Sequence, residues 1–266
     1  MSSHVRRPAV AGMFYPADPD VLARDVDAML AEAPVWPGEP PKALVVPHAG
    51  YVYSGPIAAS GYTTLRGARG RVRRVVLLGP AHYVPVVGLA FPSVDGFETP
   101  LGIVSIDPEA RRAVAELPDV VVDDAPHAPE HSLEVHLPFI QRVLGDEVTL
   151  APFVVGRASA ESVARVLDVL WGGDETVVIV SSDLSHYLDH ATARQRDEQT
   201  AELIVSGLFD RLEPEDACGA YPMRGLLVAA DRHGLHTTML DLRSSGDTAG
   251  PRDRVVGYGA FALAPT

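Results

Sequence analysis

The chain repeats one short pattern three times: an apolar run typical of a buried strand is followed, within a few residues, by a histidine. Such a run ends in a loop and delivers the histidine side chain there. Open α/β sheets place their functional residues beyond the carboxyl ends of the strands. We therefore expect the three histidines to share one metal-binding or catalytic pocket. The runs and their histidines are Ala43–Val46 with His48, Val75–Gly79 with His82, and Val177–Ser182 with His186.

Strands and helices alternate through the central half of the chain. This order predicts a mainly parallel sheet in a single α/β domain over residues 1–266. Apolar spacing predicts helices over Val21–Leu30 and Ala160–Leu170, and a third helix is expected over Ile57–Leu65. The proline-rich stretch Ala33–Pro41 breaks the first helix, but too little chain precedes it for an independent core.

Composition excludes several classes of function. A formal net charge of -13 would repel phosphates and argues against a nucleic-acid partner. No apolar run is long enough to span a bilayer, so no membrane association is expected. Cys218 is the single cysteine and cannot form an internal disulfide, which fits a reducing cytoplasm. We expect a cytoplasmic protein.

The stretch HAPEHSLEVHLPFIQRVL, residues 127–144, is dense in polar groups. Its apolar spacing predicts a helix that starts at or near Ser132, with His131 at the beginning and Glu134 in the first turn. One interpretation is a structural helix with a capping serine and a glutamate favoured by the helix dipole. Another places the polar end of this helix, with His136, beside the histidine pocket. The two interpretations are compatible.

Familiar catalytic motifs are missing from the sequence. It contains no G-x-S-x-G nucleophile turn, no phosphate-binding glycine loop and no H-E-x-x-H zinc helix. What remains is a set of dispersed imidazoles, one thiol and several carboxylates. Neutral imidazole suits iron, copper and zinc, and two histidines with one anionic ligand leave positions open for substrate or oxygen. Cys218 is the only cysteine for the third place, although it could equally be a buried, inert hydrophobe.

Five segments, taken in order, resemble the Memo family, whose prokaryotic members are called AmmeMemoRadiSam system protein B. The resemblance runs from about Arg7 to Leu263, nearly the whole chain. The family is similar in fold to the class III extradiol dioxygenases, which implies an α/β domain with a central mixed, mainly parallel sheet flanked by helices on both sides. The segments are AGMFYP, VPHAGYVYSG, LLGPAHYVP, EHSLEVHLPF and SSDLSHY.

The resemblance implies a metal site. His48 and His82 correspond to the two metal-binding histidines, and Cys218 matches the third ligand, which is a carboxylate in the dioxygenases. His186 falls where the dioxygenases keep their acid/base histidine, and the neighbouring Asp183 is expected to fix its tautomer. The implied metal is iron, as Fe²⁺, with copper as the alternative.

Five further residues are expected to line the pocket or to support its ligands. Tyr51 and Tyr187 follow metal-site histidines closely in the sequence. Metal-bound imidazoles need orienting partners, and His131, Glu134 and His136 are the candidates for that role.

Three functional hypotheses follow. The first is a redox enzyme that uses non-haem iron to activate oxygen on a small phenolic or related substrate. The second is a metal-carrying or partner-binding scaffold without dioxygenase activity, which acts with radical-SAM and AMMECR-type proteins on a macromolecule. It follows from the thiolate, which is more electron-donating and more easily oxidised than the carboxylate of the dioxygenases. The third uses Cys218 and His186 as a nucleophile and base for hydrolysis.

Overall fold

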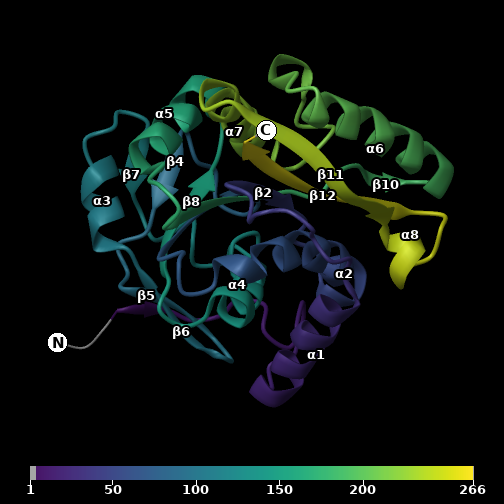
Figure 1. Ribbon diagram of the computed structural model, residues 1–266, viewed down its shortest axis with the longest axis horizontal. Helices are drawn as coiled ribbons and strands as arrows, with labels where there is room; N and C mark the ends of the chain where they lie inside the picture. The colour runs from purple at the N-terminus through teal and green to yellow at the C-terminus, as the bar shows by residue number, and fades with distance from the viewer. Residues whose placement is uncertain (1–3, 266) are drawn as a thin grey trace.

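A mixed sheet forms the centre of the molecule, and a computed structural model describes it over residues 4–265 (Figure 1). Its middle consists of four mutually parallel strands in the order β8, β3, β9, β2. Nearly every residue in them is buried, because helices cover both faces. The strands are β8 (Thr149–Val155), β3 (Arg74–Pro80), β9 (Thr176–Ser181) and β2 (Ala43–Val46).

Beyond β2 the sheet becomes antiparallel. The long strand β12 (Val255–Pro265) pairs antiparallel with β2, with β10 (His186–Leu188) and with β11 (Leu235–Ser244). Strand β10 carries one of the three predicted histidines, so this part of the sheet also reaches the site.

The other end of the sheet is made of short strands. Strand β6 continues the parallel order next to β8, β5 forms an antiparallel hairpin with β6, and β1 pairs parallel with β5. The hairpin spans residues 96–106. These strands are β1 (Val5–Arg6), β4 (Leu89–Phe91), β5 (Gly96–Thr99), β6 (Gly102–Ile106) and β7 (Val120–Val122).

Helices form a layer on each side of the sheet. Figure 1 shows α5, α6 and α7 over one face and α1, α2 and α4 over the other. The predicted mixed, mainly parallel α/β architecture is therefore confirmed. The helices are α1 (Pro19–Glu32), α2 (Tyr51–Tyr62), α3 (Pro108–Val114), α4 (Leu137–Leu144), α5 (Ala160–Leu170), α6 (His190–Val205), α7 (Ala220–Arg232) and α8 (Ser245–Thr248). None of these helices, within residues 4–265, combines the length and hydropathy that a bilayer span requires.

Local sequence explains some helix ends better than others. The Asp18 side chain caps α1 by accepting hydrogen bonds from the backbone N–H groups of Asp20 and Val21. Helix α5 has its predicted bounds. The predicted start of the second helix at Ile57 was wrong, because helix α2 starts six residues earlier, at Tyr51. The glycine, serine and proline in its first half favour a loop, but most of the helix is buried, and packing overrides that local preference.

The register of the central strands positions the site. Val46 at the end of β2 pairs with Ser181 at the end of β9, and Leu78 near the end of β3 pairs with Val180 of β9. The carboxyl ends of three parallel strands therefore meet at one edge of the sheet. The loops that follow them emerge side by side there.

Candidate metal centre

Three side chains from separate parts of the sequence meet beyond these strand ends. His48 follows β2, His82 follows β3, and Cys218 immediately precedes Gly219 and helix α7. One donor atom from each lies within 4.8 Å of the other two, so the group could hold a metal ion. The Cys218 Sγ is 3.5 Å from His48 Nε2, and the two imidazole centroids are 5.2 Å apart.

Ser181 fixes the tautomer of His48. Its Oγ donates its only hydrogen to the Ser132 carbonyl at 2.6 Å, so it accepts from both imidazole nitrogens that touch it. These are His48 Nδ1 at 2.6 Å and His136 Nε2 at 2.8 Å. His48 therefore carries its hydrogen on Nδ1. Its Nε2 lone pair is left for a metal ion.

Glu130 fixes the tautomer of His82. It was not among the site residues predicted from the sequence. Its Oε1 is 2.8 Å from His82 Nδ1, and its Oε2 accepts the His82 backbone N–H at 2.7 Å. The backbone N–H groups of His131 and Ser132 also donate to Oε1, each at 3.0 Å. Burial raises the pKa of Glu130, but these hydrogen bonds, His82 foremost, outweigh it and lower the pKa to about 2. The one sequence signal that could have identified Glu130 was its acidic side chain next to His131.

A tight loop places Cys218 against the end of β9. The Cys218 Sγ accepts the Asp183 backbone N–H at 3.3 Å, and Gly219 N–H donates to Ser182 Oγ at 2.9 Å. A Cβ on Gly219 would lie 2.5 Å from the Ser181 carbonyl oxygen, so only glycine allows this approach. Burial and the nearby Asp183 charge raise the pKa of the Cys218 thiol. A bound cation would deprotonate it, because a coordinating thiol loses its proton to the metal charge.

Asp183 and His186 lie at the same edge but do not form the expected pair. The Asp183 carboxylate turns toward His48: Oδ1 accepts its backbone N–H at 2.8 Å, and Oδ2 lies 4.0 Å from its Nε2. Burial raises the pKa of Asp183 to about 7. His186 lies at the surface on β10, and its pKa is lowered by partial burial and then by the nearby His82 imidazole. Asp183 thus positions the loop of His48.

Both predicted supporting histidines adjoin the ligands. His131 stacks on His82 with 4.7 Å between centroids and 14° between ring planes. His136 lies behind His48 and reaches it through the shared Ser181 hydroxyl. Burial lowers the pKa of His136 to about 3 and that of His131 to about 4, so both are neutral near pH 7.

Glu134 and Tyr51 point away from the three donors. The buried Glu134 carboxylate forms an ion pair with Arg6 at 2.6 Å and accepts the Tyr15 hydroxyl at 2.6 Å. It therefore holds the N-terminal segment, and Ser132 does not cap a helix there, because its Oγ donates to the Pro80 carbonyl. The hydroxyl of the buried Tyr51 donates to a backbone carbonyl in the core.

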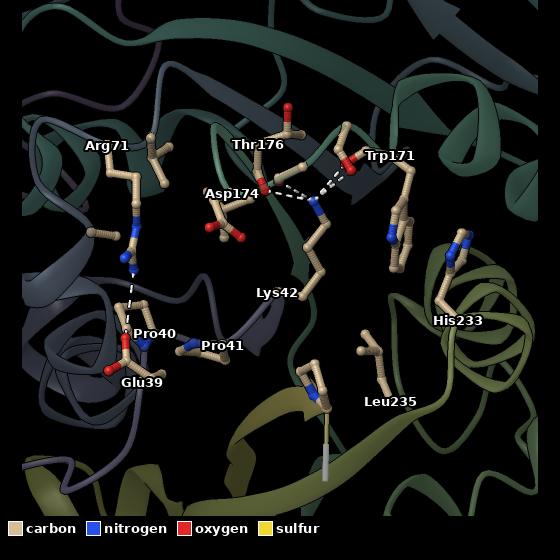
Figure 2. A pocket seen from close by; sticks show the side chains of 16 residues that line it. Glu39, Pro40, Pro41, Lys42, Arg71, Trp171, Asp174, Thr176, His233 and Leu235 are labelled. Carbon is tan, nitrogen blue, oxygen red and sulfur yellow. Dashed lines mark hydrogen bonds and ion pairs between the residues drawn. The ribbon is translucent and has the colours of Figure 1, made fainter.

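A separate cavity of about 430 Å³ opens at the opposite edge of the sheet (Figure 2). Lys42, the only lysine, lines it and donates to the carbonyls of Trp171 at 2.5 Å, Gly173 at 2.8 Å and Thr176 at 2.8 Å. These bonds occupy its three hydrogens. Lys42 precedes β2 whereas His48 follows it, so roughly 20 Å of extended chain separates them. The cavity is not part of the histidine site.

Fold and site together define an α/β protein with a candidate two-histidine, one-cysteine metal site at the carboxyl edge of its sheet. The chain belongs to the Memo-like protein family, whose sequence model matches residues 6–262. A MEMO1 family protein of Ignicoccus hospitalis is 38% identical over 96% of this chain and 97% of its own length. One from Saccharolobus islandicus is 36% identical over 95% and 97%.

A solved structure supports the fold. An uncharacterized protein from Escherichia coli K12 superposes with a TM-score of 0.52 over 81% of this chain and 98% of its own. The two sequences are only 14% identical, so the likeness concerns the arrangement of strands and helices alone.

Proposed function

We propose that this chain binds a non-haem iron ion, as Fe²⁺, through His48, His82 and Cys218, and carries out redox or oxygen-dependent chemistry on a small phenolic substrate. The observation that carries the proposal is the common orientation of the donors. Each imidazole has its Nδ1 bonded away from the shared centre, and the thiol faces the same point. Two imidazoles and one anionic ligand leave positions open on a metal ion.

When bound, the metal ion supplies a redox couple and polarises the groups that reach it. The chain's own contribution is orientation and proton transfer. The Ser181 hydroxyl and the Glu130 carboxylate keep both ligand imidazoles from rotating. The His186 imidazole, at the surface beside them and neutral near pH 7, would accept the proton of a substrate hydroxyl.

Cys218 is the feature that separates this site from a carboxylate-containing one. A thiolate is softer than a carboxylate and also suits copper. It favours a second form of the proposal, in which the protein carries a metal ion and acts with radical-SAM and AMMECR-type proteins without ring cleavage. Oxygen uptake distinguishes the two forms. Insertion of both oxygen atoms into a dihydroxylated ring needs no external electron donor, so an oxygenase should consume oxygen with the catechol alone. The metal-carrying form should consume none.

The test is the metal content of chains purified and loaded with Fe²⁺ without oxygen. We expect about one iron per wild-type chain, and loss of most of it in His48→Ala and in His82→Ala. His236→Ala, which removes an exposed imidazole on β11, is the matched control and should keep its iron. Circular dichroism checks that each variant is folded.

Two outcomes decide between the alternatives. Stoichiometric iron in both ligand variants would contradict the site itself. If iron binds as expected, a panel of catechols is then assayed for oxygen consumption. Uptake equal to the catechol consumed supports the oxygenase, whereas bound iron with no uptake on any catechol supports the metal-carrying form.

A further inference from the structure

Tyr187, next to His186 on β10, has a strained backbone. Its φ is +60°, and no other residue except glycine has a positive φ within residues 4–265. This left-handed conformation is costly for a bulky side chain. The residue is also 63% exposed, so burial does not compensate for the strain. Strain of this kind clusters at functional sites.

The strain arises at a bulge. His186 pairs with Val256 of β12 and Leu188 pairs with Val255, so Tyr187 is an extra residue with no partner in the ladder. Bulges with a left-handed residue usually place glycine there, and they re-aim a side chain beside an active site. Here the bulge turns a phenol ring outward beside the His186 imidazole, with 5.7 Å between the centroids.

Arg254 lies over this ring. Its guanidinium carbon is 4.5 Å from the Tyr187 centroid, a cation–π contact. Among residues 4–265, no acidic group lies within 4.0 Å of Arg254 to form an ion pair. The nearby Arg252 differs, because it pairs with Asp247 at 3.6 Å and donates to the Gly246 carbonyl.

We propose that Tyr187 and Arg254 bind the anionic group, carboxylate or phosphate, of a planar ring-containing substrate and so select which ring reaches His186. The substrate ring would pack against the edge of the exposed tyrosine ring, on the side of Arg254, so that the guanidinium donates to the anion. The proposed function supplies the reacting phenol, on which the inference rests, whereas the preference for an anion depends on Arg254. In a chain of net charge -13, a free guanidinium here gives anions a local binding site.

The experiment measures calorimetric dissociation constants of iron-loaded and iron-free protein, without oxygen, for three probes. Catechol is the neutral probe, 3,4-dihydroxybenzoate carries a carboxylate and phenyl phosphate carries a phosphate. In wild type we expect at least one anionic probe to bind about tenfold tighter than catechol, the effect of one charged hydrogen bond. Arg254→Gln should abolish this preference, and the matched control Arg252→Gln should keep it.

Tyr187→Gly separates a functional strain from a structural role. Glycine adopts this φ freely, so the variant should melt about 2 °C higher while losing the anion preference. Loss of the preference together with lower stability would indicate that Tyr187 has only a structural role. That result would overturn the proposed role of Tyr187 in substrate binding.

The remaining outcomes are equally decisive. Equal affinity for catechol and both anions in wild type, or equal losses in the two arginine variants, would overturn the inference while the iron site stands. An Arg254-dependent preference in a chain that fails the iron test would support the inference and reject the proposed function. Binding of none of the probes would overturn the inference.

Discussion

Glu130 shows how much of the site depends on one residue outside the His48, His82 and Cys218 donor set. Its carboxylate accepts hydrogen bonds from the ring and backbone of His82 and from two further backbone N–H groups. A carboxylate only accepts, so it forces the His82 hydrogen onto Nδ1 and leaves Nε2 free. The same residue thereby fixes the loop and the tautomer.

Glu130→Gln should weaken iron binding by about 10- to 100-fold without removing a ligand, because the amide can also donate and no longer dictates the tautomer. The measurement is a competition titration with a chelator. Glu116→Gln removes one exposed acid and should leave the affinity unchanged. If Glu130→Gln also left it unchanged, other contacts must orient His82.

At the level of elements, one buried carboxylate gathers several of the contacts that hold the N-terminal segment to the centre of the fold. Glu134 pairs with Arg6, and its oxygens accept the backbone N–H groups of Ala9 at 2.7 Å and Val10 at 3.0 Å. Nearby, Phe14 packs against His131 with 4.8 Å between ring centroids. The segment therefore forms part of the wall of the site.

Glu134→Gln leaves the buried Arg6 charge without a charged partner, although its hydrogen bonds to the His127 and Glu130 carbonyls remain. This should lower the free energy of unfolding by about 3–5 kcal/mol. Urea unfolding gives the value, and hydrogen exchange should show faster exchange at Ala9 and Val10. The exposed i,i+4 pair of Arg194 and Glu198 offers a contrast, since Glu198→Gln should cost about 0.5 kcal/mol or less. Similar losses in the two variants would contradict this role of Glu134.

Across the whole molecule, buried neutral imidazoles make the fold sensitive to acid. Burial lowers the pKa of His48, of His136 and of His127, which lies away from the metal centre near Phe97. His127 Nε2 contacts the Ala90 carbonyl at 3.0 Å. The unfolded chain binds protons at these groups more readily than the folded chain does. Stability is therefore present above the unfolded pKa and is lost as the pH falls toward the folded pKa.

His127 gives a measurable share of this effect. Its pKa falls from 6.5 to about 4 on folding, so it should contribute roughly 2 kcal/mol of destabilisation between pH 7.5 and pH 5. His127→Phe should lose that much less stability than wild type over this range, measured by urea unfolding at both pH values. His236→Phe, at an exposed position, should retain the wild-type dependence. Identical pH dependence in all three proteins would rule out His127 as a source.

Sequence alone determined the parallel strands at the centre of this protein. The apolar runs before His48 and His82 became parallel strands, because residues buried on both faces of a sheet must be apolar throughout. Parallel strands bring their carboxyl ends to one edge, so the histidines after them could be expected together. The place of Cys218, 170 residues from His48, came from the family resemblance, because no local pattern links them.

Tertiary structure alone decided what holds those side chains. Ser181 reaches His48 across 133 residues of sequence, and Glu130 reaches His82 across 48. It also determined that the Asp183 carboxylate faces His48 and that Glu134 forms an ion pair with Arg6. Helical and strand periodicity record which face of an element is buried, but a hydrogen bond between distant residues forms only when the packed sheet brings them together.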